Sequence, residues 1–206
     1  MPGLDAIRYG VAVLAVISFP PAYLYWFVLH PFAGFWRRLG PRIALTIVIV
    51  AMVGVGYGLW TVRDAVLGPD LGTGPLLWIA AAVTYGTSAW VEIRCRRQLK
   101  FRVLAGVPEL SADDPGRLLQ QGIYSRVRHP RYLSVLLGLL AMTLFANHLG
   151  LWVLLAAALP TTWALVRIEE RELRQRFGAE YERYAERVPR FLPRPGGRES
   201  AGGGVR

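Results

Sequence analysis

The chain has 206 residues, 53% hydrophobic and 18% charged, with a formal net charge of +10. This length suits a single domain, and a lone cysteine, Cys95, excludes an internal disulfide framework and a cysteine metal site. The basic residues lie between and after apolar segments, a placement that the positive-inside rule explains better than binding to nucleic acid does. We therefore expect neither nucleic acid nor a metal among the partners.

Three charge-free apolar segments come first and predict membrane-spanning helices at about 9–29, 43–62 and 76–93. Pro20 and Pro21 are expected to kink the first helix. Gly54, Gly56 and Gly58 are expected to let the second helix pack closely against a neighbour. Both features are ordinary packing devices and indicate no activity.

The next apolar run, 132–166, carries no charge apart from the possible charge of His148. As one helix it would be roughly 52 Å long, too long for a bilayer core of about 30 Å. A turn is favoured at 147–150, where Asn and Gly occur, so we expect a tight hairpin with spans at about 130–146 and 150–168. The expected fold class is all-α, a polytopic membrane protein with five transmembrane helices.

Charge orients these helices. Basic residues exceed acidic ones in the loops 30–42 and 94–131 and in the tail from Arg167, whereas the loop 63–75 holds Arg63 against Asp64 and Asp70. The positive-inside rule then places the N-terminus outside and the C-terminus in the cytoplasm. Arginine far outnumbers lysine, which is typical of a GC-rich genome and points to a bacterial inner membrane. Residues 1–195 are expected to form one domain, and the Gly-rich tail 196–206 is expected to be disordered.

A polar segment at 122–132 leads into the fourth predicted span. Pro130 suits the first turn of a helix and biases His129 toward extended backbone. Arg128 and His129 are therefore expected at the N-terminal end of that span, where free amide donors and partial positive charge favour an anion such as a carboxylate. Basic residues beside a membrane are also common as lipid anchors, so this segment alone leaves both interpretations open.

Two adjacent carboxylates, Glu169 and Glu170, follow the fifth predicted span. Adjacent helical residues point about 100° apart, so at most one of the two faces directly into a pocket. One face of a cytoplasmic amphipathic helix is predicted by the spacing of Glu170, Leu173, Phe177, Tyr181 and Tyr184. This face places Glu170 inward and Glu169 at its edge, and a solvated run of charge is the alternative.

Three motifs occur in order over 119–194: GIYSRVRHPRYL at 122–133, RIEEREL at 167–173 and FGAEYERYAERVPRFLP at 177–193. With the turn at Asn147 between them, they resemble the isoprenylcysteine carboxyl methyltransferase and phospholipid methyltransferase superfamily of membrane-embedded enzymes. The resemblance implies a site for S-adenosyl-L-methionine between the cytoplasmic ends of the last two spans, covered by the C-terminal helix. Residues 1–100 carry only the pattern of spans.

The resemblance also implies which residues form this site. The cofactor-binding residues it implies are Gly122, Tyr124, Arg128, His129, Pro130, Tyr132, Glu169 and Glu170. A carboxylate such as Glu170 suits the cofactor's ammonium, Arg128 or His129 suits its carboxylate, and a ring such as that of Tyr132 suits its adenine or its cationic methyl group. The residues expected in catalysis are Arg167, Glu169 and Glu170.

The expected methyl acceptor is lipidic or membrane-partitioned. Carboxyl O-methylation of the isoprenylcysteine type is favoured because the tail from Phe177 resembles that branch, and Arg167 would orient the acceptor's carboxylate. Phospholipid amine N-methylation, with Glu169 as base, is the alternative, and a small thiol acceptor is a third. A non-enzymatic transporter or assembly subunit is a different class of alternative, which the absence of charge near the centres of the spans disfavours.

Overall fold

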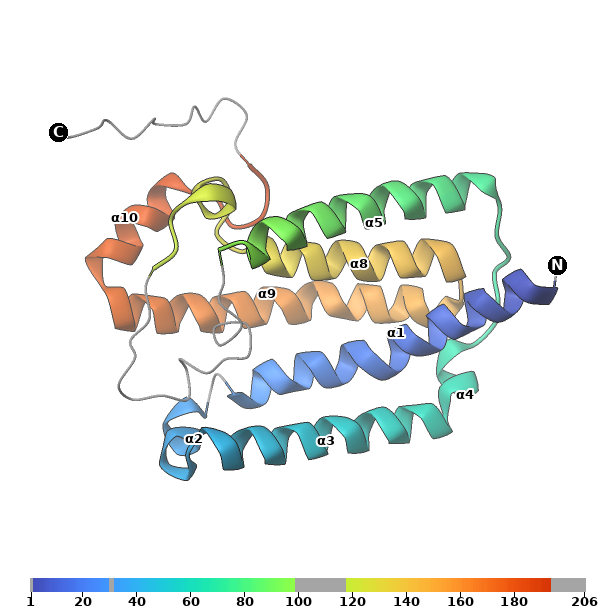
Figure 1. The fold of residues 1–206 in the computed structure, drawn as a ribbon, viewed down its shortest axis with the longest axis horizontal. Helices are drawn as coiled ribbons and strands as arrows, with labels where there is room; N and C mark the ends of the chain where they lie inside the picture. The colour runs from blue at the N-terminus through green and yellow to red at the C-terminus, as the bar shows by residue number, and fades with distance from the viewer. Residues whose placement is uncertain (1, 30–31, 99–117, 194–206) are drawn as a thin grey trace.

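A computed structural model describes residues 2–29, 32–98 and 118–193. The predicted all-α class is confirmed, because long helices running side by side make up the body of the molecule (Figure 1). These are α1 (Pro2–Leu29), α3 (Pro41–Thr61), α5 (Pro75–Arg96), α8 (Pro130–Ala146) and α9 (Leu149–Phe177). The tail at 196–206, expected to be disordered, lies outside the described residues.

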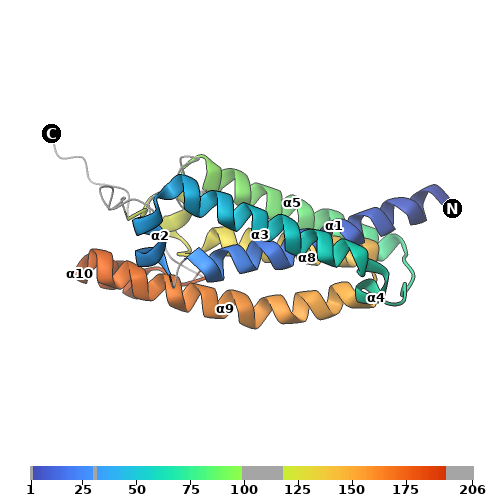
Figure 2. The ribbon, with the colours of Figure 1, turned by 90° about the horizontal axis from the view of Figure 1, so that it is seen from below.

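Shorter helices gather at the two ends of this body (Figures 1 and 2). At one end, here called the α10 end, lie α2 (Ala33–Leu39), the 3₁₀ helix η1 (Gly122–Ser125) and α10 (Ala179–Arg187). The opposite end, the α4 end, holds α4 (Arg63–Leu67) and the turn between α8 and α9. The sequence predicted loops at α2 and α4, because five to seven residues are too few to show helical periodicity.

Four helices are long and apolar enough to cross a membrane: those over Gly3–Val28, Arg42–Thr61, Pro75–Arg96 and Leu149–Phe177. The remaining predicted span, α8, is apolar but has only 17 residues. Seventeen residues make a helix of about 25 Å, slightly shorter than a typical hydrocarbon core. The five helices thus overlap the five predicted spans, and α8 is long enough to cross most of a typical hydrocarbon core.

Prolines mark the starts of three long helices. Pro41, Pro75 and Pro130 each occupy the first turn of a helix, where the missing amide hydrogen removes no helical hydrogen bond. α1 begins earlier than predicted and includes Arg8, which is only 3% exposed. That charge is tolerated because Arg8 Nη2 binds Asp70 Oδ1 at 2.5 Å and the Ala146 carbonyl at 2.9 Å.

The main apolar core joins α1 to α8 and α9 through small and branched side chains such as Ala12, Val16, Leu139 and Leu151. α3 packs on the other side of α1. A Cβ atom at Gly56 would lie 3.2 Å from the Ile17 carbonyl, whereas Gly54 and Gly58 face open space. Of the three glycines predicted to permit close packing, Gly56 alone therefore has that role within the described residues.

The predicted hairpin turn is confirmed at Asn147, which ends α8 in the left-handed conformation with φ 51°. Its side chain accepts a hydrogen bond from Trp152 Nε1 at 2.9 Å and donates to the Gly72 carbonyl at 2.6 Å. Backbone bonds from Leu71 to Asn147 and from Leu149 to Pro69 attach the preceding loop to the turn. These contacts fix the α4 end of the hairpin.

Candidate active site

The chain after α10 returns to the start of α8. The Arg128 amide donates to the Pro189 carbonyl at 2.8 Å, and the His129 amide donates to the Arg190 carbonyl at 3.0 Å. His129 precedes the first turn of α8 and lies outside the helix, so its amide is available for this contact. The two bonds join the segment before α8 to the segment after α10.

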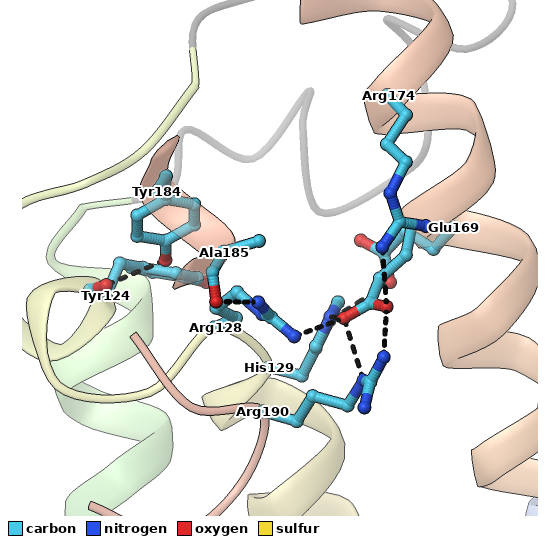
Figure 3. A network of polar contacts seen from close by, with 9 residues as sticks. Tyr124, Arg128, His129, Glu169, Arg174, Tyr184, Ala185 and Arg190 are labelled. Carbon is cyan, nitrogen blue, oxygen red and sulfur yellow. Dashed lines mark hydrogen bonds and ion pairs between the residues drawn. The ribbon is translucent and has the colours of Figure 1, made fainter. Parts of the chain in front are cut away.

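α10 is fixed on the same segment through Tyr184. The Tyr184 hydroxyl donates to the Tyr124 carbonyl at 2.7 Å, and Arg128 Nη1 donates to the Ala185 carbonyl at 2.6 Å (Figure 3). Tyr181 and Tyr184 are buried, and the partly buried Leu173 and Phe177 pack against them, as the predicted apolar face required. The predicted amphipathic helix is divided at Gly178, so that α9 carries its first part and α10 its second.

Glu170 is the centre of a buried ionic network. Its partners Arg128, His129, Arg174 and Arg190 are labelled in Figure 3. Arg190 binds both of its carboxylate oxygens, with Nε at 3.0 Å from Oε1 and Nη2 at 2.8 Å from Oε2. Arg128 Nη2 lies 2.8 Å from Oε1, and the Arg174 guanidinium lies 3.7 Å from Oε2. A carboxylate with no exposed surface is stable only when its charge is compensated, and these arginines supply the compensation.

His129 lies between the two glutamates. Its Nδ1 is 3.5 Å from Glu169 Oε2, and its Nε2 is 3.4 Å from Glu170 Oε1. Burial alone would lower the pKa of His129, but hydrogen bonds to Glu169 and Glu170 and their negative charge outweigh burial, so its pKa is raised above the usual value. The imidazole therefore tends to hold a positive charge between the two carboxylates.

A cavity of about 1340 Å³ opens beside this network. One part of its wall is polar and comes from the start of α8, the end of α9 and α10. Another part is apolar and comes from α1, through Phe19, Tyr23 and Trp26. The volume exceeds the roughly 300–1,000 Å³ of ordinary small-molecule sites, so it has room for two ligands at once.

Most of the predicted site residues reach this cavity. Its wall includes Tyr124, Arg128, His129, Pro130, Tyr132 and Glu169. Glu170 lies behind the wall, bound to Arg128. The sequence predicted that Arg128 binds the cofactor's carboxylate and that Glu170 binds its ammonium. In the structure the two side chains bind each other instead.

Gly122 and Arg167 do not line the cavity. Gly122 has φ 57°, and a Cβ atom there would overlap the Gln98 side chain, so its role in the structure is to let η1 approach the end of α5. Arg167 is exposed, and its guanidinium lies 6.0 Å from the centroid of the Trp163 ring. It precedes Glu169 by two positions, about 200° around the helix, so when Glu169 faces the cavity Arg167 faces away from it. The expected placement of Arg167 beside the acceptor is therefore corrected.

Sequence reasoning missed two residues of this region. Arg190 lies twenty positions after Glu170 in a segment without helical periodicity, so no spacing rule connects the two. Glu92 is the one acidic residue of α5 and lines the cavity, where Ser134 Oγ approaches its Oε2 at 3.0 Å. An isolated acid at the end of an apolar helix was a signal that could have identified Glu92.

Comparisons with known proteins agree with the motifs. A model of the phospholipid methyltransferase family matches residues 76–180, which are 105 of the 206 residues. The matched range contains α5 apart from its first residue, η1, α8, α9 and the first residues of α10, and therefore most of the cavity wall outside α1.

One curated relative is the cobalt-zinc-cadmium resistance protein CzcN of Cupriavidus metallidurans. It is 38% identical over 78 residues, which are 37% of this chain and 36% of the relative. The matched segment thus spans little more than a third of the length of that relative. No solved structure matches the chain.

Proposed function

The chain belongs to the phospholipid methyltransferase family of membrane-embedded methyltransferases, and we propose that it transfers the methyl group of S-adenosylmethionine to a lipidic acceptor. The observation that carries this proposal is the two-sided cavity, which has ionic groups along one wall and the aromatic residues of α1 along another. A polar cofactor and an apolar acceptor can bind next to each other in a cavity that has both a polar wall and an apolar wall. The metal resistance in the relative's name is a property of that protein and is not part of the proposal.

The polar wall suits the chemical groups of the cofactor. Arg128 Nε and the Tyr181 hydroxyl are buried without a hydrogen-bond partner among the residues described, and both residues line the cavity. The guanidinium of Arg128 suits a carboxylate, Glu169 suits an ammonium, and the rings of Tyr132 and Tyr181 suit adenine or the sulfonium. Tyr124, His129 and Pro130 complete this part of the wall.

When bound, S-adenosylmethionine supplies an electrophilic methyl group, and the protein's contribution is mainly the position of the two reactants. Correct positioning accounts for about 7–11 kcal/mol of barrier in favourable cases. The network around Glu170 holds Arg128 and His129 in fixed orientations through several charged hydrogen bonds. We propose that Glu170 acts through these residues and is a positioning residue, while Glu169 faces the reactants.

Two acceptor chemistries fit this cavity. The likeness of the tail from Phe177 to the isoprenylcysteine branch favours carboxyl O-methylation, in which an ionised carboxylate attacks and needs no base. Amine N-methylation is favoured by the family whose model matches the chain. In that reaction a base such as Glu169 must first remove a proton from the ammonium.

We also propose that the α10 end faces the cytoplasm of a bacterial cell and the α4 end faces the periplasm. The described ends of the helices alternate as the charge pattern requires, because the described parts of the basic segments before α3, before α8 and after α9 lie at the α10 end. α9 has 29 residues, or about 43 Å of helix, so its last turns extend beyond a core of about 30 Å. Glu169 and Glu170 would then lie at the inner membrane surface.

Calorimetric titration of the purified protein in detergent with S-adenosylmethionine, or with its demethylated product, tests the proposal. The wild-type protein is expected to bind both. Glu170→Ala is expected to abolish binding, because Arg128 and His129 lose the carboxylate that holds them in place on the cavity wall. Glu182→Ala, on the exposed side of α10, is the control and should bind normally. No heat with folded wild-type protein, or equal behaviour of the two variants, would contradict the proposed site.

A further inference from the structure

Four arginines lie on or against the face of α9 that carries Trp163. The Trp163 side chain is 46% exposed, and the guanidiniums of Arg167 and Arg190 lie 6.0 Å and 5.1 Å from the centroid of its ring. Arg174 follows Trp163 by almost three full helical turns and so shares its face, and Arg171 is exposed beside Arg167. The four arginines are here called the α9 arginine cluster, and none of them lines the described cavity.

The α9 arginine cluster has more positive than negative charge. Arg174 and Arg190 lie 3.7 Å and 2.8 Å from Oε2 of Glu170, which also receives a guanidinium from the cavity side. Arg167 and Arg171 form no ion pair with an acidic residue within the part of the chain that the structure describes. Like charges four positions apart repel each other and destabilise a helix. A further anion at this face would therefore relieve the repulsion.

The cluster lies at the level of the lipid headgroups. Arg167 lies about 27 Å along α9 from the first residue of that helix, Leu149, which is close to the thickness of a hydrocarbon core of about 30 Å. Trp163 lies one turn earlier, at the depth where indole rings are enriched. A phospholipid at this depth can place its phosphate beside the guanidiniums and its first methylene groups beside the indole ring.

Arg190 connects the cluster to the buried network around Glu170. Its Nε and Nη2 donate to the Glu170 carboxylate, while the other side of its guanidinium group lies near the Trp163 ring. The backbone carbonyl of Arg190 accepts a hydrogen bond from the His129 amide at 3.0 Å. An anion bound outside Arg190 would therefore help to hold the segment after α10 against the start of α8.

We propose that the α9 arginine cluster binds the phosphate of an anionic phospholipid from the membrane leaflet at the α10 end. Arg167, Arg174 and Arg190 bind the phosphate, and Trp163 packs against the lipid beside it. Guanidinium groups suit this ligand because they form paired hydrogen bonds with phosphate oxygens. The lipid is a bound ligand that supports the fold of the site and is not the methyl acceptor, since the cluster lies outside the cavity. This inference goes beyond the proposed methyl transfer and does not depend on it.

Native mass spectrometry of the full-length protein, released from a neutral detergent, measures lipid binding directly. Phosphatidylglycerol should bind more tightly than phosphatidylcholine, whose quaternary ammonium cancels the charge of its phosphate. Each arginine near an anionic membrane surface contributes about a fivefold gain in affinity, so Arg167→Gln should weaken the binding of phosphatidylglycerol by about that factor. Arg167→Lys keeps the charge and should weaken binding less. Inorganic phosphate at the concentration of the lipid should not displace it.

Arg183→Gln is the matched control, because it removes the same charge from the exposed side of α10 and should leave the affinity for phosphatidylglycerol unchanged. Amide hydrogen exchange tests the connection to Glu170. The amides of Arg128 and His129, which donate to carbonyls of the segment after α10, should exchange more slowly when phosphatidylglycerol is bound. Arg167→Gln should remove this protection at the same lipid concentration.

Three results would overturn the site. These are equal affinities for phosphatidylglycerol and phosphatidylcholine, equal losses of affinity in Arg167→Gln and Arg183→Gln, and displacement of the lipid by inorganic phosphate at equal concentration. The second of these would show that the total surface charge attracts the lipid without a specific site. Bound phosphatidylglycerol that leaves the exchange of the His129 amide unchanged would refute the connection to Glu170. These measurements require no methyl transfer, so their outcome is separate from that of the proposed function.

Discussion

At the scale of single residues, the two neighbouring glutamates at the end of α9 have different surroundings. Glu169 lines the cavity, whereas Glu170 is bound by Arg128 and Arg190 behind the wall. The sequence predicted that only one of the two can face a pocket directly, because adjacent helical residues diverge by about 100°. It placed Glu170 on the inner side of the helix, and Glu170 is indeed buried. The residue that lines the cavity, however, is Glu169.

Protonation of His129 should make this network sensitive to pH. The pKa of His129 is raised in the folded protein by Glu169 and Glu170, so the folded state binds the proton more tightly than the unfolded state does. The stabilisation is complete below the unfolded pKa of about 6.5 and is lost as the pH rises through the raised pKa. The melting temperature of wild type minus that of His129→Gln, measured in detergent, should therefore be largest near pH 6 and shrink toward alkaline pH.

Glu182→Gln serves as the control for this pH series, because Glu182 is exposed on α10 and should give only a small difference in melting temperature. A stability difference between wild type and His129→Gln that grows with increasing pH would show that the histidine is neutral in the folded protein. The charged contacts to the two glutamates would then have to be abandoned.

At the scale of secondary structure, the helical spacing from Glu170 to Tyr184 identified a real apolar face. Tyr181 and Tyr184 are buried as that spacing predicts. The break at Gly178, with φ 51°, could not be derived from the spacing, because a division of the helix there keeps the same residues on the inner side. The contact between α10 and η1 depends on the backbone carbonyl of Tyr124, which carries no sequence signal.

The hydroxyl of Tyr184 should contribute measurably to the attachment of α10. Tyr184→Phe removes the hydrogen bond to the Tyr124 carbonyl and leaves that carbonyl without its partner, which typically costs about 1 kcal/mol or somewhat more. Amide hydrogen exchange should become faster over Ala179–Arg187 while the exchange of α8 is little changed. Tyr85→Phe on the exposed side of α5 is the matched control, and an equal effect of both variants would contradict this role.

At the scale of the whole molecule, the lengths of the apolar runs were enough to locate the five long helices. The majority of the helix ends lie within a few residues of their predicted positions. The largest errors lie where polar contacts extend a helix, as at the start of α1, where Asp70 and the Ala146 carbonyl satisfy Arg8. The candidate site was predictable in its place but less so in its contacts. Arg190 and Glu92 lie in segments that contact the motif residues only in the folded chain. No regular spacing in a single sequence predicts such contacts between distant segments.

Orientation in the membrane is the last property that the charge pattern predicts, and the lone cysteine makes it accessible. Cys95 is buried, and a Cys95→Ala background removes the native thiol, so that only an introduced cysteine can react. Into this background we would introduce Ala65→Cys on α4 and, separately, Glu182→Cys on α10, both at exposed positions.

Basic residues exceed acidic ones in the segments at the α10 end, so a membrane-impermeant maleimide should label Ala65→Cys in intact bacterial cells. Glu182→Cys should be labelled only after the cells are permeabilised. The reverse pattern would place the cavity on the outer side, away from the compartment that supplies S-adenosylmethionine, and would contradict both the topology and the proposed reaction.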